Sequence, residues 1–216
     1  MKIGVVFFHK NILDIYEYSW IASCVQSMQL QSFQPLNFYE VNYGDCDRQY
    51  VDESKFFNKN FENHSFAMNY IISKAFDDGC DFVFNTNMDD YYDIYRVEDQ
   101  LPYLKAGYDI VASDFFKIDD KLLFNQPNSG EILAYKYTSS FGSIRGNLLV
   151  KHNVIAHPSV AYSRKFWEDE NNRYGENDIP REDLILWTKS IHRGYSFFIV
   201  PDPLLFYRIH SNQICK

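Results

Sequence analysis

The sequence has few cysteines, and their spacing indicates neither a zinc site nor a disulfide framework. The four of them, Cys24, Cys46, Cys80 and Cys215, lie far apart without a C-x-x-C pair. Reduced thiols and a cytoplasmic location are therefore the simpler interpretation. The six histidines lack both cysteine partners and H-x-x-x-H spacing, so we do not expect a closed tetrahedral zinc site.

Blocks of basic residues and long apolar runs are also missing. The 216 residues include 21 Lys and Arg against 29 Asp and Glu, which gives a formal net charge of -8. Because nucleic acids and anionic membrane surfaces are bound through basic patches, we expect neither as a partner. Residues 18–39 carry no charge, but their four Gln and several Ser do not suit a bilayer core, so no membrane span is predicted. The apolar run after Met1 is too short for a signal peptide.

Aromatic residues, in contrast, are abundant. The chain contains 19 Phe and 17 Tyr, and 46% of its residues are hydrophobic. This composition predicts a globular core with prominent aromatic packing and aromatic pocket walls. The length fits a single domain, which we expect to span residues 1–216.

The first ninety residues alternate between strand and helix patterns. The continuous apolar run at residues 3–8 predicts a strand covered on both faces, and residues 36–41 and 81–84 are predicted as further strands. Apolar spacing over residues 21–28 and over residues 61–78 predicts the two helices between them. This order is typical of an α/β fold with a mainly parallel central sheet flanked by helices. Such sheets bind ligands at the carboxyl ends of their strands.

The second half has a more mixed pattern. It predicts helices at 96–105 and around 184–191, extended segments at 108–115 and 155–162, a hairpin or flap within 116–137, and two closing strands at 196–200 and 204–209.

Two acidic elements carry candidate chemistry. Asp89 and Asp90 follow a predicted strand, where a carboxylate pair on a tight loop can hold one hard cation, although a solvated acidic loop is the common alternative. Glu182 and Asp183 stand at the start of a predicted helix, whose backbone N–H groups stabilise an ionised carboxylate that can accept a proton. The alternative there is ordinary helix capping.

A third element lies near the C-terminal end of the sequence. Arg208 could fork onto phosphate oxygens, and His210 could ligate a metal or hydrogen-bond a leaving diphosphate. The alternatives are an arginine at a strand edge and an exposed histidine near a frayed terminus.

Taken in order along nearly the whole chain, these elements resemble the family 2 glycosyltransferases, which are inverting enzymes with the GT-A fold. The matching motifs are VVFFHKN at 5–11, the helix with Ser27 and 31–34, NYGD at 42–45, the helix with Ala67, Asn69 and Ala75, FVFNTNMDD at 82–90, AHPSV at 156–160, and the segment from GENDIPRED to YRIHSNQI at 175–214.

The resemblance implies a role for each matching residue. Asp89 matches the metal-binding carboxylate of the D-x-D element, Asp90 and His210 would complete the metal site, and Asp183 matches the general base. The donor contacts that it implies are made by His9, Asn11, Asn42, Asn69, Asn87 and Arg208.

Two departures from the family pattern matter. Asn87 replaces the first Asp of D-x-D, and because an amide oxygen is uncharged, we expect weaker metal binding or compensation by His210. Asn42 replaces the usual base-contacting Asp, and an amide both donates and accepts, so the base preference is less defined.

The resemblance implies a GT-A, Rossmann-like fold in which residues 1–115 bind the nucleotide sugar and residues 116–216 form a smaller, mixed part for the acceptor and the base. It implies an inverting, metal-dependent hexosyltransferase that uses Mn²⁺ or Mg²⁺ to move a sugar from a UDP-sugar to an acceptor hydroxyl of a glycan. Because the last motif lies close to Lys216, further domains of a longer polypeptide are one expectation.

Two other functions stay open. A nucleotidyltransferase also places acidic metal ligands behind a nucleotide-binding fold, but FFHKNILD at residues 7–14 lacks the glycines of a phosphate-binding loop. A non-catalytic nucleotide-sugar or glycan binder would account for Asn87, although it would not need a base at Asp183.

Overall fold

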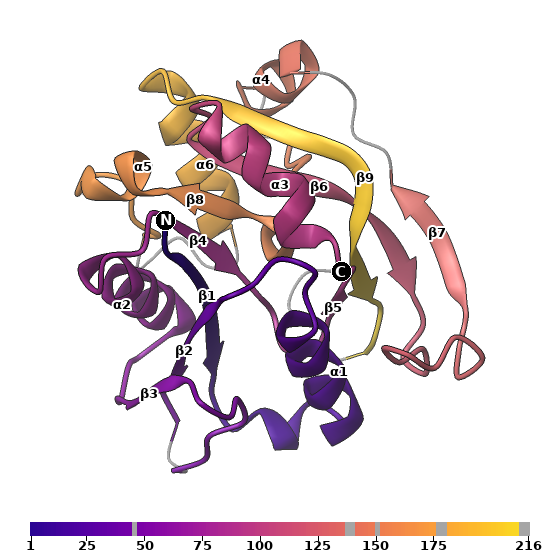
Figure 1. The fold of residues 1–216 in the computed structure, drawn as a ribbon. Coiled ribbons are helices and arrows are strands. Elements are labelled where there is room, and N and C mark those ends of the chain that lie inside the picture. The colour runs from indigo at the N-terminus through magenta and orange to yellow at the C-terminus, as the bar shows by residue number, and fades with distance from the viewer. Residues whose placement is uncertain (45–46, 137–140, 150–151, 176–180, 212–216) are drawn as a thin grey trace.

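The computed structural model describes residues 1–44, 47–136, 141–149, 152–175 and 181–211. Within them nine strands form one sheet, in the order β3-β2-β1-β4-β8-β6-β9-β5 with β7 paired to β6 (Figure 1). The strands are β1 (Ile3–His9), β2 (Asn37–Asn42), β3 (Lys55–Asn58), β4 (Phe82–Asn85), β5 (Tyr91–Tyr92), β6 (Ile110–Ile118), β7 (Ile132–Lys136), β8 (Ala161–Ser163) and β9 (Phe197–Arg208). Strands β3, β2, β1 and β4 are parallel, as are β6 and β9, while β8 runs antiparallel between β4 and β6.

Helices cover both faces of this sheet. They are α1 (Tyr18–Gln29), α2 (His64–Asp77), α3 (Arg96–Lys105), α4 (Phe141–Leu149), α5 (Arg164–Glu168) and α6 (Glu182–His192), with the 3-10 turns η1 (Ile12–Asp14) and η2 (His157–Ser159). Buried side chains of α1 and α3 share one core cluster, whereas those of α2, α4, α5 and α6 share the other. The expected α/β architecture with a flanked central sheet is confirmed.

The apolar run of β1 shows why the first strand could be predicted. Val5 and Phe7 point into the cluster under α1, while Val6 points into the cluster under α2. Successive strand residues face opposite sides of a sheet, so a strand covered on both sides has no polar face.

Helix α2 begins later than the sequence predicted, at His64 rather than residue 61. The side chain of Asn63 accepts hydrogen bonds from the backbone N–H groups of Ser65 (3.0 Å) and Phe66 (3.4 Å). This side-chain cap fixes the first turn. The helix ends before Gly79, which has a φ of 90° that a residue with a side chain rarely adopts.

The predicted pair of closing strands is wrong, because β9 is one strand from Phe197 to Arg208. Its pairing with β6 shifts register on both sides of Asp114, which lies opposite Pro203, and the residues skipped before it include Pro201. Proline has no N–H to donate, so the ladder is interrupted there without ending the strand.

Residues 155–162 were predicted as extended, but η2 precedes β8 within them.

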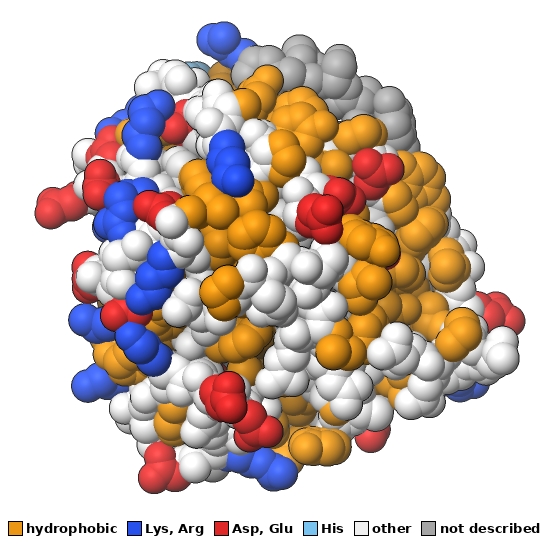
Figure 2. Space-filling model, in the orientation of Figure 1, with side chains coloured by type: hydrophobic (Ala, Val, Ile, Leu, Met, Phe, Trp, Pro, Cys, Tyr) orange, Lys and Arg blue, Asp and Glu red, His pale blue; other side chains and the backbone are white. Residues whose placement is uncertain are grey.

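The hairpin expected within residues 116–137 is present as the antiparallel pair of β6 and β7. Ile132, Leu133 and Tyr135 of β7 are 53, 52 and 45% exposed, and orange side chains gather on the right of Figure 2, where β7 lies. Strand β6 crosses the expected boundary at residue 115, and one sheet includes strands from both halves. The division into two functional halves stays a prediction.

Two further features concern surface charge and the length of the helices. On the face drawn in Figure 2, Lys and Arg side chains alternate with Asp and Glu rather than form a broad basic patch. No helix in the described ranges is long and apolar enough to cross a membrane.

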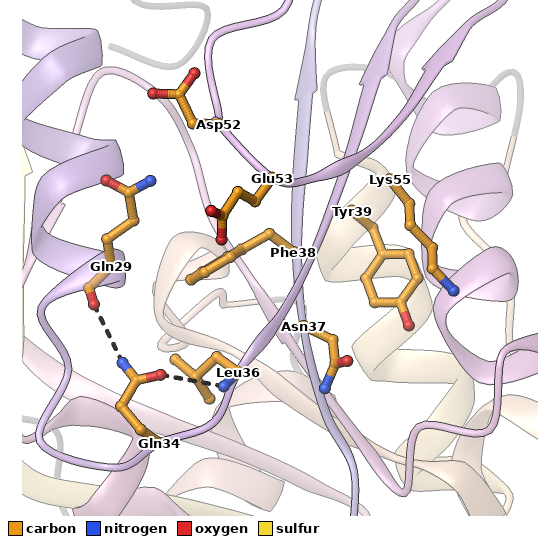
Figure 3. A pocket seen from close by; sticks show the side chains of 9 residues that line it. All are labelled: Gln29, Gln34, Leu36, Asn37, Phe38, Tyr39, Asp52, Glu53 and Lys55. Atoms are coloured by element: carbon orange, nitrogen blue, oxygen red, sulfur yellow. Dashed lines mark hydrogen bonds between the residues drawn. The ribbon is translucent and has the colours of Figure 1, made fainter.

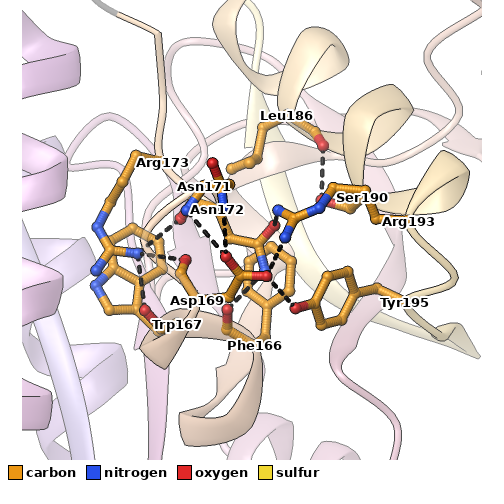
Figure 4. A network of polar contacts seen from close by, with 10 residues as sticks. All are labelled: Phe166, Trp167, Asp169, Asn171, Asn172, Arg173, Leu186, Ser190, Arg193 and Tyr195. Atoms are coloured by element: carbon orange, nitrogen blue, oxygen red, sulfur yellow. Dashed lines mark hydrogen bonds and ion pairs between the residues drawn. The ribbon is translucent and has the colours of Figure 1, made fainter.

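A polar network joins α5 to the end of α6 (Figure 4). Asn172, which is fully buried, donates from Nδ2 to the carbonyl of Phe166 (2.7 Å) and accepts from Nη1 of Arg193 (3.0 Å). Asp169 also accepts from Arg193 and from the hydroxyl of Tyr195. The network holds the two helix ends together beside the aromatic core around Trp187.

We expect Asn172→Ala to lower the free energy of unfolding by about 1 to 3 kcal/mol, because it leaves buried groups without partners. Asn171→Ala is the matched control, since the exposed side chain of Asn171 bonds only to Asp169. It should change stability by less than about 0.5 kcal/mol. Urea unfolding of both variants tests the difference, and equal losses would contradict the assignment.

Candidate active site

The acidic loop between β4 and β5 meets the end of β9. Oδ2 of Asp89 lies 3.1 Å from Nε2 of His210, and their side chains are 12 and 3% exposed. The His210 ring packs against Trp20 (5.1 Å between ring centroids) and edge-on against Tyr16 (5.6 Å). A carboxylate and an imidazole 121 residues apart in sequence therefore form a pair at the carboxyl ends of β4 and β9.

Asp90 has a different environment from Asp89. It is fully buried, and its Oδ1 accepts the backbone N–H of Arg208 (2.8 Å). Burial and the neighbouring charge of Asp89 raise the pKa of Asp90 well above its ordinary value. No group of three or more His, Cys, Asp or Glu among the described residues is arranged to hold a metal, and the metal role expected of Asp90 stays a prediction.

Arg208 contacts the backbone on both sides of the acidic loop. Its Nε donates to the carbonyl of Asp89 (2.7 Å), and its Nη1 donates to the carbonyls of Asp119 (3.1 Å) and Leu122 (2.8 Å). The guanidinium lies 5.0 Å from the ring of Trp20, and the residue is fully buried. In the structure these donors hold the loop, and the phosphate contact expected of Arg208 stays a prediction.

Asn87 is placed at the centre of the loop by its backbone. Its N–H donates to the hydroxyl of Tyr92 (2.8 Å), and its carbonyl accepts from the thiol of Cys24 (3.3 Å). Its buried Oδ1 has no hydrogen-bond partner among the described residues. Because buried polar atoms are nearly always bonded, this oxygen is available to a ligand.

The predicted nucleotide-binding turns come together at the ends of β1 and β2. The carbonyl of His9 accepts the N–H of Tyr43 (3.0 Å), and Oδ1 of Asn42 accepts the N–H of Gly44 (2.9 Å). A Cβ on Gly44 would push the side chain of Asn11 aside, so glycine suits the close approach of the two turns. Three of the predicted donor contacts, His9, Asn11 and Asn42, thus belong to one cluster.

Sequence patterns did not single out Glu40, which lies under this cluster. Its fully buried carboxylate bonds to Nε2 of His9 (2.8 Å) and accepts the backbone N–H groups of Tyr50 (2.7 Å) and Val51 (3.0 Å). It therefore fixes the His9 ring and the segment before β3. A charged residue inside an otherwise apolar strand was the one available signal.

Asp183 lies in the first turn of α6, as predicted. Its Oδ2 accepts from Nδ2 of Asn153 (2.7 Å) and its Oδ1 accepts from the N–H of Leu184 (2.6 Å). The neighbouring Glu182 pairs with His64 (2.7 Å). Although burial raises the pKa of Glu182, the hydrogen bond from His64 leaves it below its ordinary value. The Glu182 carboxylate is thus bound to a side chain of α2. Asp178, four residues before Glu182 in the sequence, is the other nearby carboxylate that could act as the base, and it lies outside the described residues.

The side chain of Asn69, which was predicted to contact the donor, bonds to the backbone of Tyr174. Its Nδ2 donates to the carbonyl of Tyr174 (2.9 Å), and its Oδ1 accepts the N–H of the same residue (3.0 Å). The Tyr174 hydroxyl bonds to Nε2 of His157 (2.8 Å) and to Tyr162. Burial lowers the pKa of His157, which favours the neutral ring. This buried chain was not predicted from the sequence.

Two cavities are lined by residues other than Asp89, His210 and Asp183. One of about 510 Å³ is lined by Asn37, Phe38 and Tyr39 at the amino end of β2 and by Glu53 and Lys55, with Lys55 beside Tyr39 (Figure 3). The other, of about 550 Å³, lies between β5 and the hairpin that leads into β7. We therefore define the candidate site by the polar residues described above and not by a cavity.

Comparison with known proteins gives a structural likeness alone. No protein-family model matches the sequence, and no curated protein matches it. The structure is similar to S. aureus TarS 1–349 in complex with UDP-GlcNAc, with a TM-score of 0.68 at 15% identity over 99% of this chain. It is also similar to the complex of TarS 1–349 with UDP (TM-score 0.66, 16% identity, 97% of this chain) and to TarS (0.65, 15%, 97%).

The chain spans 60 and 61% of the two TarS 1–349 complexes and 37% of TarS. At this identity the likeness shows the fold. The GT-A-like α/β fold expected from the sequence is therefore confirmed, with its mostly parallel central sheet flanked by helices.

Proposed function

We propose that this chain is a glycosyltransferase of the hexosyltransferase type that uses a UDP-sugar as donor. The observation that carries the proposal is the pair of Asp89 and His210 at the carboxyl ends of β4 and β9. In α/β sheets this edge is where ligands bind. The likeness to TarS structures with UDP-GlcNAc and UDP supports a uridine nucleotide at the corresponding place.

Asp89 and His210 fit a divalent cation. Mg²⁺ is typically held by one or two protein ligands and completes its shell with water and substrate phosphates, and Mn²⁺ accepts imidazole as well as carboxylate. The orphaned Oδ1 of Asn87 is a third potential ligand atom, in the same loop as Asp89. When bound, Mn²⁺ or Mg²⁺ neutralises the diphosphate and stabilises it as a leaving group. In this proposal Asp90 supports the site from within the core, because its carboxylate accepts the backbone N–H of Arg208.

His9, Asn11 and Asn42 form the cluster that we assign to the nucleoside. Asn69 and Arg208 support the site indirectly in this proposal. Their side chains donate hydrogen bonds to the backbone carbonyls of Tyr174 and Asp89 respectively.

Asp183 takes the proton from the acceptor hydroxyl in this proposal. The apolar face of α6 is buried through Leu186 and Trp187, so the first turn is anchored to the core. A base must hold its position within about 2.6 to 3.2 Å of the hydroxyl. Direct attack from the opposite side of the sugar ring then inverts the anomeric carbon. The acceptor is a hydroxyl of a glycan or glycoconjugate, and the reaction takes place in the cytoplasm.

A non-catalytic nucleotide-sugar binder is the second candidate. The amide at Asn87 and the engagement of Asp90 with Arg208 favour it, since both reduce the number of charged metal ligands. Slow donor hydrolysis that depends on Mn²⁺ and stops with a chelator separates an enzyme from a binder.

We expect UDP or a UDP-sugar with Mn²⁺ to raise the melting temperature, because a ligand at about 100 times its Kd stabilises the folded state by about 2.7 kcal/mol. Asp89→Ala should remove the Mn²⁺-dependent part of the shift by deleting the carboxylate next to His210. Thermal unfolding with nucleotide, with and without EDTA, provides the measurement.

Asp202→Ala is the control for Asp89→Ala, since Asp202 is exposed on β9 near the register shift and away from the acidic loop. It should keep the full shift. A wild-type melting temperature that ignores every nucleotide sugar with metal present would refute the donor site.

We expect Asp183→Asn to bind UDP-sugar as the wild type does but to transfer sugar at least about a hundredfold more slowly, because general-base catalysis contributes about 10² to 10⁴. Calorimetry measures donor binding, and a UDP-release assay with acceptor measures transfer. Glu182→Gln is the neighbouring control, since its carboxylate is bound to His64.

If Asp183→Asn keeps normal transfer and Glu182→Gln or Asp178→Asn abolishes it, the base is assigned to the wrong residue. If all three variants stay active, the single-displacement mechanism has no support.

A further inference from the structure

Arg96 is a fully buried cation behind the acidic loop. No carboxylate among the described residues forms an ion pair with it. Its guanidinium lies 4.2 Å from the ring of Tyr92 and 5.6 Å from that of Phe84. Burial lowers the pKa of Arg96 to about 10, so it remains charged at neutral pH. Because a buried charge costs several kcal/mol, a residue that serves packing alone would be apolar.

The guanidinium instead joins two segments of the candidate site. Its Nη2 lies within bonding distance of the carbonyls of Asn85 (2.8 Å), Pro158 (3.1 Å) and Val160 (3.3 Å). Asn85 is the last residue of β4, where the acidic loop begins. Pro158 and Val160 belong to the segment that carries His157. One side chain therefore fixes the start of the acidic loop against the start of β8.

Gln100, one helical turn after Arg96, extends the same contact. Its Oε1 accepts Nε of Arg96 (3.1 Å), and its Nε2 donates to the carbonyls of Val111 (3.0 Å) and Ser159 (2.9 Å). The two side chains thus connect α3 with backbone groups of β4, β6 and the segment before β8.

A second route leads from Arg96 to the middle of the loop. The cation lies against the ring of Tyr92, and the Tyr92 hydroxyl accepts the N–H of Asn87 (2.8 Å). Arg96 therefore acts on the loop at Asn85 directly and at Asn87 through Tyr92. Asp89, two residues further on, then lies opposite His210 with its carbonyl held by Arg208.

We propose that Arg96 is a positioning residue that, together with Tyr92, holds the acidic loop in the geometry that binds a divalent cation with the nucleotide. Arg96 does not touch the donor, because it is buried behind the loop. The inference rests on the proposed function. Residues that orient metal ligands in this way are worth about 10- to 100-fold in metal affinity.

The test compares UDP binding in Mn²⁺ with UDP binding in EDTA, by calorimetry on the full chain. Arg96→Lys keeps the charge, but an ammonium cannot reproduce the planar fork on three carbonyls. We expect the affinity gain that Mn²⁺ gives to fall about tenfold or more, while UDP affinity in EDTA stays within about twofold. Tyr92→Phe removes only the hydroxyl that holds Asn87 and should reduce the same gain without removing the ring under Arg96.

Arg164→Lys is the matched control at the other end of β4. Arg164 also donates to two backbone carbonyls, those of Phe76 and Cys80, and lies 5.5 Å from the ring of Phe76. It should lower the melting temperature and leave the Mn²⁺-dependent gain unchanged.

The outcomes separate this inference from the function on which it rests. A wild-type chain that binds no UDP in Mn²⁺ refutes the proposed function. A wild-type chain that binds, with an unchanged gain in Tyr92→Phe and in a folded Arg96→Lys, refutes the positioning role alone. An equal loss of the gain in Arg164→Lys would mean that general destabilisation explains the effect. If Arg96→Lys does not fold, Tyr92→Phe decides.

Discussion

The candidate site depends on the contact between Arg208 and the acidic loop. The backbone N–H of Arg208 donates to Asp90, and its Nε donates to the carbonyl of Asp89. These two bonds join the end of the last strand to a loop about 120 residues earlier in the sequence, and they place His210 opposite Asp89. Because both bonds are buried, water does not compete for them, and breaking either would leave unsatisfied groups in the core.

The same region contains an unusual set of charges. Burial and the charge of Asp89 raise the pKa of Asp90, and the charges of two buried arginines, Arg208 and Arg96, oppose that rise. Both arginines donate from their guanidinium groups to backbone carbonyls. This arrangement offsets the charge of the loop while leaving the Asp89 carboxylate directed at His210. A direct salt bridge to Asp89 would compete with any cation.

The parts of the fold that the sequence predicted are those that local patterns determine. The apolar run of β1 and the spacing in α1 and α3 depend on burial alone, and the structure confirms them. Strand β3 is only four residues long, and α4 contains two glycines, so neither has a strong periodic signal. The acidic loop and the end of β9 could be named as site elements from their residues. Their bonds could not, because period-2 alternation gives the face of a side chain but not its partner across the sheet.

Asn87 illustrates how the buried charges and the proposed metal chemistry depend on each other. With aspartate at this position the loop would add a third carboxylate beside Asp89 and Asp90, and its charge would repel theirs. The amide avoids that repulsion, and its oxygen remains a neutral ligand. Fewer charged protein ligands weaken the binding of a cation on its own, so the diphosphate must supply the remaining oxygens. Under the proposed function, cation and nucleotide therefore bind together, and the position of the loop matters more than its charge.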